Sequence, residues 1–160
     1  MEMDIARLSV ECFHESIADP DVFCGGGSVA AITVAGAAAT ALLVMRLDLK
    51  RRANREQIGA IDASAQRTRE IIATLHALAD ADIAALDVLL DAQRAVKDGA
   101  VGAEDRYLDA LAGAARSPLA IGDAALELLL MIERELERAA RFTVSDLGAA
   151  AALIEGACRA

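Results

Sequence analysis

The sequence predicts an all-α fold, a bundle of about five to six helices around a long, alanine-rich central helix. The chain is 56% hydrophobic but only 2% aromatic, so its core must be built from small side chains that let helices approach closely. Apolar residues recur every three or four positions along most of the chain, and no segment alternates convincingly with the period of two that a strand requires. At 160 residues, we expect one domain spanning residues 1–160.

A first helix is predicted over residues 3–17. Its apolar members follow the helical period: Ile5, Leu8, Cys12 and Phe13. Pro20 lies in the loop predicted over residues 18–27, because proline cannot continue a helix.

The central helix is predicted from the seventeen uncharged residues Val29 to Met45. This stretch reaches the lower edge of the length that a membrane span needs. It consists mostly of Ala, Thr, Val and Gly and lacks aromatic anchors at its ends. We therefore expect a buried core helix and no association with a membrane.

The glycine turn before this helix, formed by Gly25, Gly26, Gly27 and Ser28, is the first candidate binding site. Consecutive glycines let a ligand approach the main chain closely. Ser28 is predicted to be the N-cap, and the unpaired N–H groups of the first turn can hold a carboxylate or a phosphate. The alternative is a flexible connection with a serine cap, and the spacing matches neither of the known glycine-rich phosphate loops.

A basic cluster, formed by Lys50, Arg51, Arg52 and Arg55, closes the central helix. Cations at a helix C-terminus interact favourably with the helix dipole, which is the structural explanation. Recognition of an anionic substrate tail is the functional alternative.

Residues 56–95 contain no proline and predict one very long helix, or two helices with a break near Gly59. One stripe of this segment is apolar and contains Ile71, Leu75, Leu78, Leu86 and Leu89. Asp82 lies on the same stripe, four residues after Leu78 and four before Leu86. A carboxyl group in such a place is paired, held neutral, or exposed in a cleft, so Asp82 is the candidate catalytic residue.

A second face of this helix carries His76, Asp80, Asp87 and Asp91. We interpret it as a solvated stripe, with a metal site as the weaker alternative. The three cysteines, Cys12, Cys24 and Cys158, show no metal-ligand spacing either. We therefore expect no metal and a reduced, cytoplasmic protein, although Cys24 before a helix N-terminus leaves a thiol site open.

Three further helices are predicted over residues 103–116, 119–141 and 143–158. Pro118 suits a first helical position, and Glu133 through Arg138 are expected to pair along an outer face. Ser145 or Asp146 is expected to cap the last helix. The formal net charge of −9 argues against nucleic acid or an anionic membrane as a partner and suits a cationic substrate group.

Four ordered segments resemble the formiminotetrahydrofolate cyclodeaminase and methenyltetrahydrofolate cyclohydrolase family. The most specific is Gly25 to Ala31, which is similar to the PGGGSVAA signature of that family. Asp80-Ala81-Asp82 with Ala85-Leu86 resembles its D-E-D-A-x-A-F segment. Arg116 to Leu119 and Ser145 to Gly148 resemble its A-A-x-x-P-L turn and its S-D-x-G element.

The resemblance implies an all-α bundle that forms a homodimer and acts on a folate one-carbon unit, with a tetrahydrofolate derivative as substrate and no separate cofactor. It implies a catalytic role for Asp82 and substrate-binding roles for Gly25, Gly26, Gly27, Ser28 and Asp146. A carboxylate can hold the cationic methenyl bridge while it polarises the attacking water, and it can supply a proton when ammonia leaves.

The chain also departs from the family pattern. Cys24 stands where the family has proline, Leu86 replaces a phenylalanine, and the chain stops before the asparagine-containing C-terminal helix of the family. Two alternatives to folate turnover therefore remain. One is a relative that acts on another small cationic or cyclised substrate, and the other is a helical assembly or binding module without catalysis.

Overall fold

The computed structural model describes residues 4–22, 24–51 and 56–159 of the chain. Within these residues it contains a short 3-10 helix and six α-helices, and no strand. Their bounds are η1 (Ile5–Arg7), α1 (Val10–Ala18), α2 (Gly26–Leu49), α3 (Ile58–Lys97), α4 (Ala103–Ala114), α5 (Arg116–Leu136) and α6 (Val144–Cys158). The predicted all-α bundle is confirmed.

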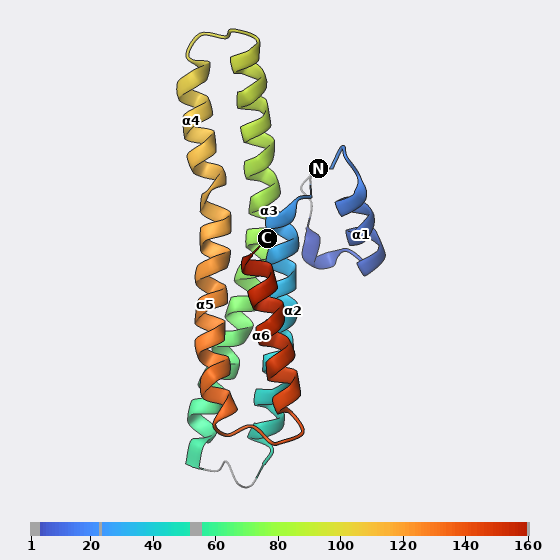
Figure 1. The fold of residues 1–160 in the computed structure, drawn as a ribbon, viewed down its shortest axis with the longest axis vertical. Helices are drawn as coiled ribbons and strands as arrows, with labels where there is room; N and C mark the ends of the chain where they lie inside the picture. The colour runs from blue at the N-terminus through green and yellow to red at the C-terminus, as the bar shows by residue number, and fades with distance from the viewer. Residues whose placement is uncertain (1–3, 23, 52–55, 160) are drawn as a thin grey trace.

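Helix α2 is the centre of the bundle and packs against α3, α5 and α6. Its core-facing residues are mostly small, since Ala31, Ala37, Ala38 and Ala41 are fully buried. Figure 1 shows that α2 and α6 accompany only the lower half of α3, whereas the upper half of α3 continues beside α4. We call the part of α3 after Ile83, together with α4, the arm.

The prediction of one helix over residues 3–17 is wrong. The chain forms η1, leaves helical geometry at Leu8 and starts again as α1. The break occurs because Ser9 caps α1, its side chain accepting a hydrogen bond from the Cys12 N–H at 3.1 Å. No residue of α1 is buried, and this helix stands beside the bundle in Figure 1.

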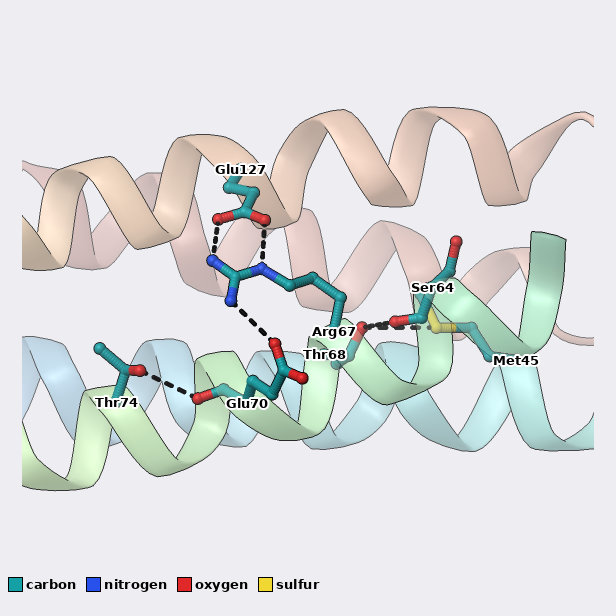
Figure 2. Close-up of polar contacts among 7 residues, drawn as sticks. All are labelled: Met45, Ser64, Arg67, Thr68, Glu70, Thr74 and Glu127. Atoms are coloured by element: carbon teal, nitrogen blue, oxygen red, sulfur yellow. Dashed lines mark hydrogen bonds and ion pairs between the residues drawn. The ribbon is translucent and has the colours of Figure 1, made fainter.

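Helix α3 is a single helix of 40 residues, so the uninterrupted alternative is confirmed. Arg67 on α3 forms a fork of two hydrogen bonds, 2.6 and 2.8 Å long, with the carboxylate of Glu127 on α5, and a third bond with Glu70 (Figure 2). On the side that faces α2, the buried Thr68 hydroxyl donates to the Ser64 carbonyl at 2.8 Å and lies 3.5 Å from the sulfur of Met45. These contacts fix the register of α3 against its two neighbours.

One ion pair lies at the end of α2 and another at the end of α5, and a hydrogen bond joins the two ends. Asp48 and Glu135 are both fully buried, and Arg51 donates to the Asp48 carboxylate at 2.8 Å and to the Arg138 carbonyl at 3.0 Å. Arg138 in turn makes two hydrogen bonds to Glu135. The predicted outer-face pairing is therefore wrong for Glu135, which points into the bundle.

The basic cluster after α2 thus has a structural role at Arg51, which pairs with a buried carboxylate. Arg52 and Arg55 lie outside the described residues. Helix α2 itself is long and apolar enough to cross a membrane, but 61% of its most apolar window is buried inside the bundle, as in the core helix of a soluble protein.

Candidate functional site

The N-terminus of α2 lies against α3 at Asp82. Gly25, with an extended backbone, is the N-cap of α2, so the prediction that Ser28 caps this helix is wrong. The chain is already helical at Gly26, and this places Ser28 in the first turn, where its side chain turns inward and is fully buried. The helix therefore begins with glycines whose N–H groups lack helical partners.

Gly27 is the residue that allows α2 to approach Asp82. A Cβ atom placed on Gly27 would lie 2.5 Å from Oδ2 and 2.6 Å from Cγ of the Asp82 carboxyl group. The same atom placed on the neighbouring Gly26 would meet nothing within 4 Å. Gly27 is thus the glycine of the turn that the packing requires, and the carboxylate lies at the positive end of the helix dipole.

Ser28 joins the two helices through its hydroxyl group. The Ser28 Oγ lies 3.1 Å from the Ala79 carbonyl and 3.3 Å from Oδ2 of Asp82. Asp82 itself is half-buried, so part of the residue remains accessible while α2 contacts its carboxyl group.

Cys24 is the third member of this cluster. Its thiol is buried, and burial raises its pKa; the negative charge of Asp82 raises it further, while a hydrogen bond with Ser28 acts in the opposite direction. The helix N-terminus was expected to favour the thiolate. Since desolvation is the larger effect, Cys24 remains a thiol at neutral pH and is a poor nucleophile there.

A cavity of about 230 Å³ lies on the other side of the glycine turn. It is formed where the first turns of α2 and α5 meet the last turn of α6. Its lining residues are Gly26, Gly27, Ala30, Pro118, Ile121, Gly122, Ala157 and Cys158. The glycine turn, the Arg116 to Leu119 segment and the Asp82 segment, which are distant in sequence, therefore converge on one place.

Comparison with known proteins identifies the family. A family model described as formiminotransferase-cyclodeaminase matches residues 9–160. The chain belongs to this family.

Among solved structures, the formiminotransferase-cyclodeaminase fold of this chain matches the formiminotetrahydrofolate cyclodeaminase of Thermotoga maritima with a TM-score of 0.88. The two sequences are 24% identical, and the match covers 96% of this chain and 74% of that chain. A search of curated proteins finds no significant match. The expected family membership is confirmed, and the structural match shows a shared fold.

Asp146 lies apart from the other predicted site residues of this cyclodeaminase-family chain. It is half-buried in the first turn of α6, whereas Ala157 near the end of the same helix lines the cavity. With a rise of 1.5 Å per residue, the two positions are about 16 Å apart along the helix axis. Helix α6 therefore carries Asp146 away from the glycine turn. The role of Asp146 in substrate binding stays a prediction.

The predicted cap of α6 is wrong as well. Thr143 is the N-cap position, and its hydroxyl donates to the Ala140 carbonyl at 2.8 Å. Ser145 and Asp146 already belong to the helix. The carboxylate of Asp146 nevertheless lies in the first turn, where a negative charge is favourable.

The second face of α3 does not gather into a site. Asp80 accepts a hydrogen bond from the Ile5 N–H at 3.0 Å and so anchors η1, while Asp87 and Asp91 are exposed. Among the described residues, no group of three or more His, Cys, Asp or Glu side chains is arranged to hold a metal ion.

Sequence reasoning missed four lining residues of the cavity. Ile121 and Gly122 follow Pro118 by one helical turn, so the Pro118 segment carried a signal for them. No signal in the sequence indicated Ala157 and Cys158, because only the antiparallel packing of α6 on α2 brings the end of the chain to the glycine turn.

Proposed function

We propose that this protein is a folate one-carbon enzyme that hydrolyses methenyltetrahydrofolate or cyclodeaminates formiminotetrahydrofolate, with Asp82 as its catalytic carboxylate. The observation that carries the proposal is the contact of Asp82 with Gly27, in a chain of the formiminotransferase-cyclodeaminase family. A half-buried carboxylate held by the signature turn of that family is placed for proton transfer to a bound substrate.

In cyclohydrolysis, water attacks the methenyl carbon, which carries a delocalised positive charge between N5 and N10. Asp82 stabilises this cation and accepts a proton from the attacking water, and the bond between the carbon and one ring nitrogen then breaks as that nitrogen takes up a proton. The negative overall charge of −9 favours the approach of the cationic group.

In cyclodeamination, N10 attacks the formimino carbon and the former imino nitrogen leaves as ammonia. The formimino group reacts in its protonated amidinium form, N10 loses a proton during ring closure, and the leaving nitrogen gains one and departs as ammonia. A single carboxyl group can accept the first proton and deliver the second, so Asp82 suits this reaction as well.

Substrate binding is assigned to the main chain of Gly25, Gly26 and Gly27, whose N–H groups belong to the start of α2. They can hold a carboxylate or a ring carbonyl of the substrate. The Ser28 side chain is fully buried against α3, so its contribution to the site comes through Asp82. Neither proposed reaction uses a further cofactor. The free thiols of Cys12, Cys24 and Cys158 suit the reducing cytoplasm.

The proposal is tested with purified protein by the loss of near-ultraviolet absorbance of methenyltetrahydrofolate, and by its appearance from formiminotetrahydrofolate. We expect Asp82→Asn to lower kcat by about 100-fold or more in whichever reaction the protein catalyses, because the proton acceptor is lost. Asp87→Asn is the matched control, since Asp87 is an exposed carboxylate on the same helix. Rates equal to the spontaneous ones, or an equal loss in both variants, would refute the assignment.

A further inference from the structure

Ser28 has one hydroxyl proton and two oxygen acceptors, and the Cys24 thiol is a third hydrogen-bonding partner. Its Oγ lies between the Ala79 carbonyl, at 3.1 Å, and the Asp82 carboxyl group, at 3.3 Å. Ser28 is fully buried, so no water molecule can supply a second hydrogen-bond donor. The hydroxyl can donate to only one of the two oxygen atoms at a time.

The choice of acceptor depends on the state of Asp82. When Asp82 is ionised, the Ser28 hydroxyl donates to its oxygen, which favours the charged form. The Ala79 carbonyl then keeps the main-chain N–H donor that α-helical geometry provides. When Asp82 is protonated, its O–H donates to the Ser28 oxygen, and the Ser28 hydroxyl donates to the Ala79 carbonyl.

We propose that Ser28 is a positioning residue that holds Asp82 in one place in both of its protonation states, by rotating its hydroxyl proton between Asp82 and the Ala79 carbonyl. This inference deepens the proposed function and rests on it for its catalytic consequence. Both proposed reactions require Asp82 to take up a proton and to release it again. If the Asp82 side chain moved whenever it gained or lost a proton, it would lose its position beside the reacting atoms. Ser28 prevents this movement.

Gly27 and Ser28 act on the same carboxyl group from adjacent positions of α2. Gly27 leaves the space that the carboxyl group occupies, and Ser28 supplies the hydrogen bond that keeps it there. Gly27 and Ser28, which are adjacent in the signature sequence, therefore both position the Asp82 carboxyl group. This explains why a serine belongs in the turn although it does not cap the helix.

Few charged groups surround this pair. The Cys24 thiol lies beside both residues and remains protonated at neutral pH because it is buried. The charged or titratable groups nearest on the neighbouring elements are Asp80 on α3, Arg116 on α5 and Cys158 at the end of α6. Asp80 is already engaged by the Ile5 N–H, and the charged residues of α2 lie at its far end.

The direct test is a carbon-13 NMR titration of the aspartate carboxyl groups, with the Asp82 signal identified by its absence in Asp82→Asn. In the unmodified protein, we expect one sharp Asp82 signal on both sides of the titration, whereas in Ser28→Ala the signal should broaden or split, because the carboxyl group is no longer held in one place. Ser28→Cys keeps a weaker donor of similar size, should give less broadening, and serves if the alanine variant does not fold.

Thr68→Val is the matched control. Thr68 is another fully buried hydroxyl of the interface between α2 and α3, but it donates to a carbonyl and lies 14 residues from Asp82, or about 21 Å along α3. It should lower thermal stability without broadening the Asp82 signal. A single sharp Asp82 signal in both Ser28 variants, or equal broadening in Thr68→Val, would overturn the proposal.

Kinetics then test the catalytic consequence. We expect Ser28→Ala to lower kcat about 10-fold with little change in KM. A loss confined to KM would overturn the positioning role and point to substrate binding. If the unmodified protein turns over neither folate, the proposed function fails, while the NMR titration still decides the role of Ser28.

Discussion

At the scale of single residues, the site depends on a missing side chain at Gly27. A methyl group there would occupy the place of the Asp82 carboxyl group, whereas a methyl group on Gly26 would point into open space. Both glycines lie in the first turn of α2, but only Gly27 faces Asp82. A side chain at Gly27 is therefore incompatible with the observed place of the Asp82 carboxyl group.

We expect Gly27→Ala to lower kcat by about 100-fold, because the Asp82 side chain must turn away from its position. The cost in stability should stay below about 1.5 kcal/mol, since the displaced group is the end of a short side chain. Enzyme assays and urea denaturation of both variants provide the measurement. Gly36→Ala adds a methyl group to the same helix where nothing lies within 4 Å, so it should remain active, and equal activity of the two variants would contradict the requirement at Gly27.

Sequence reasoning identified the members of this site but not their roles. Asp82 was recognisable because a carboxylate stood on an apolar stripe, and the glycine turn because of its composition. The role of Ser28 was not, since a serine before a helix suits an N-cap equally well, and only the packing of α2 on α3 turns its hydroxyl toward Asp82. The distance of Asp146 likewise follows from the direction in which α6 runs.

At the scale of the helices, the paired ends of α2 and α5 determine how the bundle closes below the site. Glu135 is fully buried and holds Arg138, whose carbonyl oxygen accepts from Arg51 at the end of α2. The hydrogen bonds with Glu135 raise the pKa of the Arg138 guanidinium, which therefore stays charged throughout the physiological range. A buried charge without its partner is strongly destabilising.

Glu135→Gln should therefore lower the free energy of unfolding by about 3 kcal/mol, because it removes the buried carboxylate that hydrogen-bonds Arg138 and leaves that guanidinium only the weaker attraction of Asp48 and Glu137. Urea denaturation measures this change. Glu133→Gln, which alters an exposed residue of the same helix, should change stability by less than about 0.5 kcal/mol. Similar losses in the two variants would show that the buried pair is not what holds the helix ends.

The helices themselves were largely predictable, because apolar periodicity reports which face of each helix is buried. Helix α3 and the small-residue core of α2 follow from it. The break between η1 and α1 does not, since Ile5, Leu8, Cys12 and Phe13 keep the helical period across it. At this point a local hydrogen bond to the Ser9 side chain starts a new helix, although the apolar pattern continues without a break.

At the scale of the whole molecule, the arm is the part whose apolar surface its own chain leaves uncovered. Among its described residues, only Ala103 and Ala110 are buried, while Val88 is 59% and Leu108 60% exposed. A groove of about 690 Å³ runs between α3, α4 and the start of α5. Alanines and Val88 form much of its lining, and its charged residues are Asp91, Asp109, Arg106 and Arg116.

We propose that a second copy of the chain occupies this groove. A two-fold axis brings each surface onto itself, so a groove that carries both acidic and basic residues can place the acids of one copy opposite the bases of the other. Two helices alone bury too little apolar surface to be stable, and two arms side by side would form a four-helix layer. We therefore expect a homodimer, with about twice the chain mass of 16.7 kDa in light scattering.

Val88→Glu should convert this dimer to monomers, because it places a charge in the apolar centre of the groove. Val101→Glu is the control, since Val101 is 99% exposed at the tip of the arm and does not line the groove. Circular dichroism should show unchanged helix content in both variants. A monomeric wild-type protein, or the same mass for both variants, would contradict pairing through the arm. Because Asp82 lies one turn before Ala85 in that groove, loss of the dimer should also weaken binding at the glycine turn.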